Sequence, residues 1–128
     1  MADTTKTDFA DKAETFQAAL MSLFSGDPDS TETDLSKLLT PTFTIQADEN
    51  KMDFPAFVAH MRHLREILPS VRLTTTQFLR DGAQLAERHS SSTIGPDGFV
   101  GNAETFLFAE VAEDGRLEWI VETVRKRD

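Results

Sequence analysis

The sequence predicts an α+β domain in which N-terminal helices pack on a curved, mixed but mainly antiparallel sheet and enclose an apolar pocket. Two patterns carry this prediction. In parts of the N-terminal half, hydrophobic residues recur every three or four positions, as in amphipathic helices. In the C-terminal half they alternate with polar residues, as in strands, and Asp-Gly pairs separate two of the alternating stretches. Asp-Gly between alternating stretches is a strong hairpin signal.

Three helices are expected before residue 70. The first spans residues 8–24, because its Phe, Leu and Ala residues form one helical stripe. A short second helix over residues 34–39 follows a polar loop. The third begins near Pro55, because proline suits the first turn of a helix, and it ends before Pro69.

Six strands are expected. Phe43, Ile45 and Ala47 alternate with polar residues in a half-buried strand, and residues 51–53 return as its short partner. Tight turns then join four longer strands, and such turns determine which residues face each other. These four strands are predicted at residues 71–80, 83–94, 99–112 and 117–125.

A polar group is predicted on one face of this sheet. With two-residue Asp-Gly turns and a four-residue loop at residues 95–98, His89 lies opposite Glu104, and Glu87 lies opposite Phe106. Opposed side chains approach closely, so we expect a hydrogen bond between His89 and Glu104. His89 is then a candidate general base, Glu104 the carboxylate that orients it, and Glu87 an acid or second base. The alternative is that these residues form only a satisfied polar pair at the pocket rim.

The same face gathers most aromatic side chains of the sheet and is expected to meet the Phe-rich helices around the pocket. The predicted pocket residues are Phe16, Leu20, Phe43, Phe57, Met61, Thr74, Thr76, Phe78, Phe106, Phe108, Trp119 and Val121. The opposite face carries smaller side chains and offers a surface for a twofold homodimer. On that face, Arg88 and Glu122 are expected to form a structural or interface salt bridge. A single β-bulge would exchange the two faces beyond it.

Composition excludes several classes of function. The net charge of −9 disfavours binding to nucleic acid, and the absence of cysteine excludes thiolate nucleophiles and cysteine-ligated metals. His60 and His63 are three residues apart but lack an inward third ligand, so no metal site is predicted. No cofactor is expected.

The chain organisation is simple. One domain over residues 1–128 is expected, with flexible ends at residues 1–7 and 126–128. The polar N-terminus lacks the apolar run of a signal peptide, and no stretch is apolar enough to span a membrane. A cytoplasmic protein without membrane contact is therefore expected.

The element order and two segments, DGAQLAERH at residues 81–89 and DGRLEWIVE at residues 114–122, resemble the SnoaL-like branch of the NTF2-like superfamily. The resemblance covers nearly the whole chain. It implies a cone-shaped pocket into which Glu87 and His89 point, and dimers formed through the sheet. It also implies cofactor-independent chemistry, as in polyketide cyclases, ketosteroid isomerases, dehydratases and isomerases of secondary metabolism. The chain departs from the isomerases in having no tyrosine, a common oxyanion donor among them.

Three functions follow as hypotheses. The first is a cofactor-independent isomerase, cyclase or dehydratase that acts by acid–base chemistry on a small apolar carbonyl compound. The second is a non-catalytic module for small-molecule binding or dimerisation, which the absence of tyrosine favours. The third is a structural scaffold.

Overall fold

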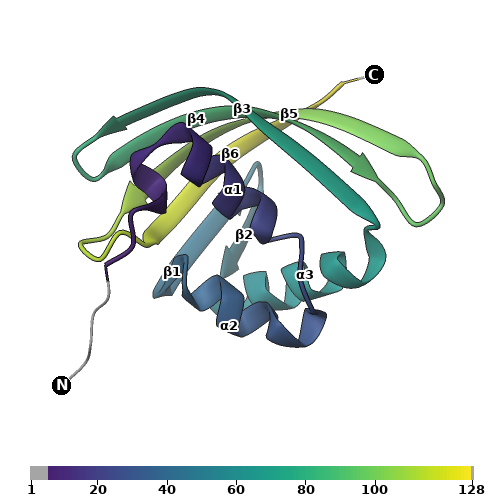
Figure 1. Cartoon of the computed structure of the whole chain (residues 1–128), viewed down its shortest axis with the longest axis horizontal. Helices are drawn as coiled ribbons and strands as arrows, with labels where there is room; N and C mark the ends of the chain where they lie inside the picture. Colours follow the sequence, from purple (N-terminus) through teal and green to yellow (C-terminus); the bar gives the residue numbers. More distant parts are fainter. Residues whose placement is uncertain (1–5, 128) are drawn as a thin grey trace.

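A six-stranded sheet curves over helices that cover one of its faces (Figure 1). The computed structural model describes residues 6–127. The strand order is β2-β1-β6-β5-β4-β3; β1 and β6 run parallel, and the other neighbours run antiparallel. The predicted α+β class, with a mixed but mainly antiparallel sheet, is confirmed. The sheet stays open, with β2 and β3 at its edges.

The α-helices of the described chain are α1 (Ala13–Ser22), α2 (Thr31–Ser36) and α3 (Phe54–Ile67), and single 3-10 turns, η1 (Phe9–Asp11) and η2 (Pro28–Ser30), precede the first two. The strands are β1 (Leu39–Ala47), β2 (Asn50–Asp53), β3 (Ser70–Asp81), β4 (Gln84–Ile94), β5 (Val100–Val111) and β6 (Leu117–Arg127). None of the helices within residues 6–127 has the length and apolar character needed to cross a lipid bilayer.

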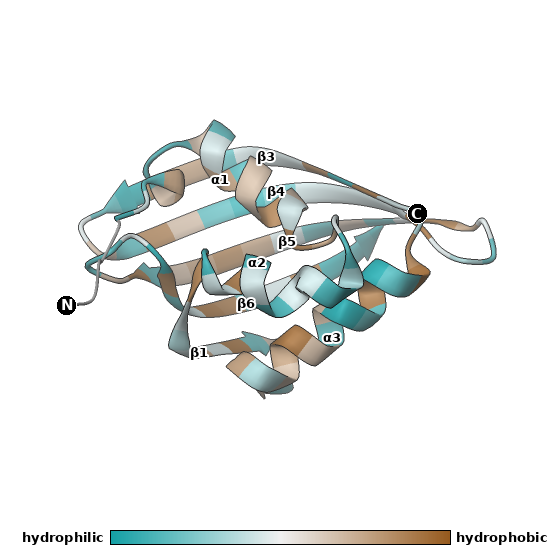
Figure 2. Cartoon of the chain, turned by 60° about the horizontal axis from the view of Figure 1, so that its bottom comes forward, coloured by the Kyte–Doolittle hydropathy of each residue, from teal (hydrophilic) through white to brown (hydrophobic). Residues whose placement is uncertain are grey.

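The helices begin and end where local chemistry permits. At α3, the Asp53 carboxylate accepts a hydrogen bond from the Ala56 N–H at 3.0 Å, and Pro55 lies in the first turn. The helix predicted over residues 8–24 is interrupted, because Lys12 has an extended backbone between η1 and α1. One side of α3 is apolar and the other polar, as the colours in Figure 2 show.

The structure describes part of each chain end. Of the segments expected to be flexible, residues 1–5 and 128 lie outside the described residues. Strand β6 extends to Arg127, two residues further than predicted. The Thr7 N–H donates a hydrogen bond to the Asp114 carbonyl at 2.8 Å, so the N-terminal segment lies against the β5–β6 turn.

The β4–β5 hairpin differs from prediction by one residue. Ile94 pairs with Val100, which leaves a five-residue loop at 95–99 rather than four residues. The loop closes when the Gly95 N–H donates to the Phe99 carbonyl at 2.9 Å. His89 therefore lies opposite Thr105, and the predicted pairing of His89 with Glu104 is wrong. A shift of one residue exchanges the two faces of a strand, which moves Glu104 away from His89.

The exchange of faces extends to β6, because β6 keeps its predicted pairing with β5, in which Phe106 lies opposite Thr123. A bulge at Thr76 in β3 separately turns Thr74 away from the helices. The helix-covered face is therefore made by Glu87, His89, Thr105 and their alternate neighbours. The residues predicted on that face that lie outside it are Thr74, Thr76, Glu104, Phe106, Phe108, Trp119 and Val121.

Two predicted pocket residues fill the core. Phe16 and Phe43 are completely buried. The Phe16 ring lies 5.6 Å from that of Phe78, and the Phe43 ring lies 5.6 Å from that of Phe57. Aromatic pairs at such distances add to the stability that burial provides.

A buried arginine joins the helices to one another. The Arg65 side chain is 1% exposed. It donates to the carbonyls of Ser22, Leu23 and Asp27 at 2.9, 3.1 and 3.1 Å, and to the Asp34 carboxylate at 3.0 Å. The guanidinium of α3 thus satisfies the carbonyls at the end of α1 and fixes α2 beside them.

Replacing this arginine should destabilise the fold. We expect Arg65→Met to lower the free energy of unfolding by about 3 kcal/mol, because buried carbonyls and Asp34 lose their partner. Arg62→Met on the same helix is the control; its exposed ion pair with Asp29 should contribute less than about 1 kcal/mol. Urea unfolding of both variants measures the difference, and equal losses would contradict this role for Arg65.

Candidate active site

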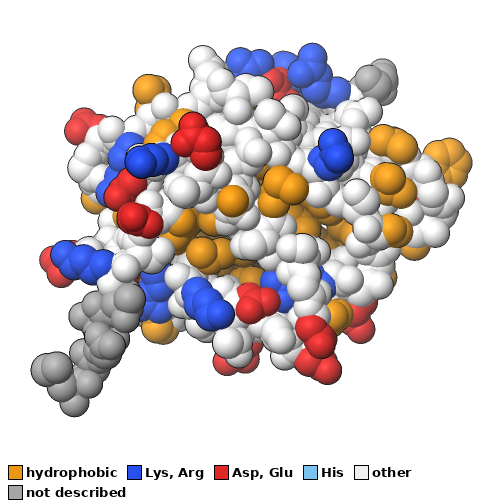
Figure 3. Space-filling view, in the orientation of Figure 1, with side chains coloured by type: hydrophobic (Ala, Val, Ile, Leu, Met, Phe, Trp, Pro, Cys, Tyr) orange, Lys and Arg blue, Asp and Glu red, His pale blue; other side chains and the backbone are white. Residues whose placement is uncertain are grey.

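A cavity of about 240 Å³ lies between the sheet and helices α1 and α3. Leu20, Phe57 and Met61 line it, together with other apolar side chains of α1, α3 and β1. In the space-filling view, hydrophobic side chains gather in the recess between the sheet and the helices below it (Figure 3). Polar side chains reach the cavity from the sheet, through His89, Thr105 and Glu122.

His89 is held by the carboxylate of Glu87, two residues earlier on the same strand face. His89 Nδ1 lies 2.7 Å from Glu87 Oε1, and both side chains are buried. The Thr75 hydroxyl donates to the other carboxylate oxygen, Glu87 Oε2, at 2.8 Å. An ionised Glu87 can only accept from Nδ1, and in that arrangement a neutral His89 presents its lone pair at Nε2. Glu87 therefore orients His89, the role expected of Glu104.

The second nitrogen of His89 opens onto the cavity. No hydrogen-bond partner for Nε2 occurs within residues 6–127. In the same part of the chain, every fully buried side-chain nitrogen or oxygen has a partner. Because His89 lines the cavity, Nε2 is accessible from it. A nitrogen in this position can accept a proton from a bound molecule.

Glu122 lines the same cavity from β6. Burial raises the pKa of the Glu122 carboxyl group above its usual range; His89 opposes this rise when it is protonated, and the charges of Glu87 and Asp48 add to it. A carboxyl group with a raised pKa keeps its proton at a higher pH and can donate it. The predicted ion pair with Arg88 is wrong, because the sheet separates the two side chains.

Glu104 belongs to an arginine cluster on the outer face of the sheet. Its side chain is 4% exposed and accepts from Arg88 Nε at 2.6 Å and Arg125 at 2.8 Å. The hydrogen bond from Arg88 and the nearby positive charges of Arg88, Arg125 and Arg127 lower the pKa of Glu104, although desolvation opposes them. Glu104 therefore pairs with arginines on the outer face of the sheet, away from His89, and does not orient its ring.

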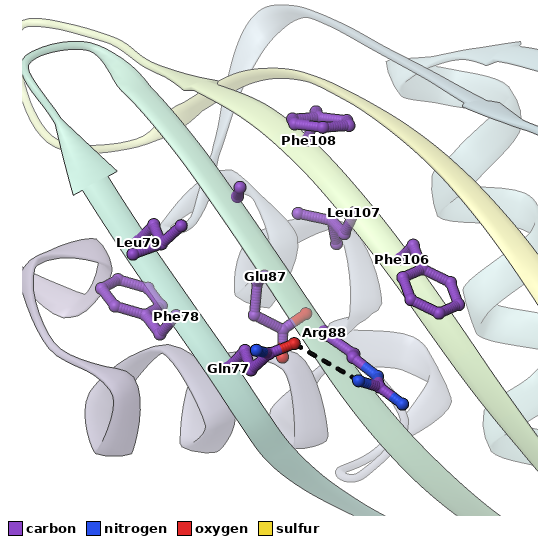
Figure 4. A pocket seen from close by; sticks show the side chains of 9 residues that line it. Gln77, Phe78, Leu79, Glu87, Arg88, Phe106, Leu107 and Phe108 are labelled. Atoms are coloured by element: carbon purple, nitrogen blue, oxygen red, sulfur yellow. Dashed lines mark hydrogen bonds between the residues drawn. The ribbon is translucent and has the colours of Figure 1, made fainter.

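Several predicted pocket residues instead form an apolar surface on the outer face. We call Leu79, Phe106, Phe108 and Val121 the outer patch; they are 71, 39, 61 and 44% exposed. Figure 4 shows Leu79, Phe106 and Phe108 around a shallow groove, with Arg88 reaching toward Gln77. The Arg88 guanidinium lies 5.3 Å from the centre of the Phe106 ring, within the range of a cation–π contact.

The histidines of α3 differ in position. His60 lines the mouth of the cavity and is exposed, whereas His63 is exposed and does not line it. No cluster of three His, Asp or Glu side chains with metal-binding geometry occurs among residues 6–127.

Sequence reasoning missed Glu122 and Thr105 as cavity residues. Both lie on strands that carry apolar side chains on each face, so the alternation of polar and apolar residues does not show which face points toward the helices. The usable signal was a charged residue, Glu122, between the aliphatic Ile120 and Val124 on one face of the last strand.

Comparison with known proteins adds structural neighbours. No protein-family model matches the chain, and no curated protein sequence matches it. Among solved structures, an NTF2-like protein of unknown function from Exiguobacterium sp. 255-15 has a TM-score of 0.69 at 14% identity, covering 84% of this chain and 96% of its own. A candidate isomerase of the SnoaL-like family from Agrobacterium tumefaciens str. C58 has a TM-score of 0.65 at 14% identity, covering 88% and 97%.

A candidate SnoaL-like polyketide cyclase from Jannaschia sp. CCS1 is similar over 97% of this chain and 90% of its own, with a TM-score of 0.66 at 12% identity. Identities this low establish a shared fold and leave the chemistry to the site itself. The chain has the NTF2-like fold.

Proposed function

We propose that this protein catalyses cofactor-independent proton transfer on a small apolar carbonyl compound, as an isomerase, cyclase or dehydratase. The observation that carries the proposal is the His89–Glu87 pair, whose free Nε2 opens onto the cavity that Glu122 lines. The likeness to candidate isomerases and cyclases gives it fold-level support.

The two groups divide the chemistry. His89 Nε2 accepts a proton from the carbon next to the carbonyl, and the electron pair of that C–H bond moves toward the carbonyl oxygen. The protonated Glu122 donates to this oxygen as negative charge develops. Glu87 stabilises the imidazolium that forms and keeps the ring in place.

The fate of the resulting enol defines the reaction. Returning the proton to a different carbon gives an isomer. Losing a hydroxyl group from the neighbouring carbon as water gives a dehydration, and attack of the enol carbon on a second carbonyl closes a ring. All three require the same base and acid, with no electron acceptor.

Removing either group should reduce turnover. We expect His89→Ala and Glu122→Gln each to lower kcat by about 10²- to 10⁴-fold, the usual contribution of a general acid or base. His63→Ala, an exposed histidine outside the cavity, is the control and should leave kcat unchanged. Turnover of the substrate, with circular dichroism to verify folding, measures the effect. Full activity in folded His89→Ala would exclude His89 as the base.

The raised pKa of Glu122 should also change how the free energy of unfolding depends on pH. With a raised pKa in the folded state, Glu122 keeps a proton that the unfolded chain has already lost. The free energy of unfolding should therefore fall as pH rises from the usual glutamate range through the raised pKa of Glu122, by at most about 1.4 kcal/mol per pH unit. Urea unfolding of Glu122→Gln over this range should lack that fall. Exposed Glu113→Gln is the control and should retain it.

We also propose that a second copy of this chain covers the outer patch. Monomeric proteins rarely expose several large apolar side chains together, and a sheet face can pack on its own copy about a twofold axis. Leu79, Phe106, Phe108 and Val121 come from three strands of one face, which makes the patch broad rather than local.

Charge placed in this patch should prevent the association. We expect Phe108→Arg to weaken dimer formation by about 30-fold or more, the effect of removing a central interface residue. The control is Phe99→Arg, because Phe99 is 77% exposed but lies in the β4–β5 loop. Light scattering coupled to gel filtration gives the mass of each variant across concentrations. A monomeric parent protein at high concentration would refute the proposal.

A further inference from the structure

We infer that the cavity takes an uncharged carbonyl compound of one or two rings and holds its oxygen at Thr105 and Glu122. The inference deepens the proposed function and rests on it for the reaction. Three properties of the cavity lead to it: volume, charge, and the arrangement of polar and apolar lining groups.

The volume limits the size of the ligand. About 240 Å³ is below the about 300–1,000 Å³ typical of drug-sized pockets. A cavity below that range suits a ligand smaller than a drug-sized molecule, so one ring or two fused rings match it better than a four-ring compound does.

The charge of the lining excludes anions. Among the described residues that line the cavity there is no lysine or arginine, and the basic side chains there are the imidazoles of His60 and His89. The acidic groups near its floor are Glu122, and Glu87 behind His89. A carboxylate or phosphate on the ligand would be desolvated beside these acidic groups with no lysine or arginine to pair with it, which is unfavourable. The ligand is therefore uncharged.

The lining is divided between apolar and polar sides. Helices α1 and α3 supply apolar side chains such as Leu20, Phe57 and Met61, and the sheet supplies the hydroxyl and carboxyl groups. A ligand that matches both sides has an apolar ring body and one polar group directed at the sheet.

Among the hydroxyl groups that line the cavity, that of Thr105 is best placed to bind the polar group of the ligand. Thr105 is 5% exposed, lies directly opposite His89, and lines the cavity. Its hydroxyl has no hydrogen-bond partner within residues 6–127, and no fully buried polar atom there lacks one, so the hydroxyl is open to the cavity. A buried, unpaired donor beside the base gives a carbonyl oxygen a bonding site that an alkane cannot use.

Binding of four probes tests size and charge separately from turnover. The probes are 1-tetralone, a two-ring ketone; tetralin, the same rings without oxygen; 1-naphthoate, a two-ring anion; and a four-ring steroid ketone. We expect 1-tetralone to bind about tenfold more tightly than tetralin, and the other two to bind at least about tenfold more weakly than 1-tetralone. Isothermal titration calorimetry gives the affinities, and the His89 ring signals in NMR locate the ligand.

Two matched variants test the oxygen site. Thr105→Val keeps the shape of the side chain and removes its hydroxyl, so it should weaken 1-tetralone about tenfold and leave tetralin unchanged. Thr74→Val, at an exposed threonine that the β3 bulge turns away from the helices and that does not line the cavity, should change neither. Equal loss of both probes in Thr105→Val would show a packing effect and overturn the assigned role of Thr105.

Failure of this inference can be told apart from failure of the proposed function. Tighter binding of the steroid ketone or of 1-naphthoate, or no binding of 1-tetralone, overturns the substrate class and leaves the His89 and Glu122 turnover test standing. Binding in the expected order, with turnover unaffected in His89→Ala, supports the substrate class and refutes the assigned catalysis.

Discussion

The pairing of β4 with β5 is the constraint on which the rest of the molecule depends. Eleven residue pairs join these strands from Gln84 to Ile94. Successive side chains point to opposite faces, so this ladder decides which set lies under the sheet. It places Leu107 and Ala109 in the core and leaves Phe106 and Phe108 outside. Since β6 pairs with β5 in step, the same choice also sets the last strand.

Packing explains why this register is favoured. Phe16 and Phe43 are completely buried and contact other aromatic rings beneath the sheet. Turning Phe106 and Phe108 inward would force two more large rings into a space that these side chains already occupy, and overpacking costs about 1–3 kcal/mol per site. The smaller Leu107 and Ala109 leave room under the sheet, and the cavity occupies part of that room.

Much of the fold could be predicted from the sequence, because its signals are local. Helical stripes and turn residues placed the helices of the N-terminal half and the four long strands within a few residues, apart from the break at Lys12. Glu87 and His89 do point inward, but the pattern that favoured this direction was misleading, because Phe106, Phe108 and Trp119, which were counted onto the same face, lie on the other one. The partner of His89 was not predictable, because Gly95-Pro96-Asp97-Gly98 permits either a four- or a five-residue loop, and the choice depends on packing across the whole sheet.

Glu122 is half-buried, and its burial depends on where β6 lies in the sheet. Strand β6 is between β1 and β5, and its parallel pairing places Glu122 beside Ala47. The Asp48 N–H extends this pairing by donating to the Glu122 carbonyl at 2.9 Å, which brings an acidic turn next to the carboxyl group.

Desolvation and this neighbour both raise the pKa of Glu122. In a chain without tyrosine, the proposed chemistry uses a carboxyl group with a raised pKa as the proton donor that a phenol could otherwise provide. The strand order and the proposed chemistry are therefore linked: an edge position for β6 would expose Glu122, and the same residue would then be an ordinary surface carboxylate.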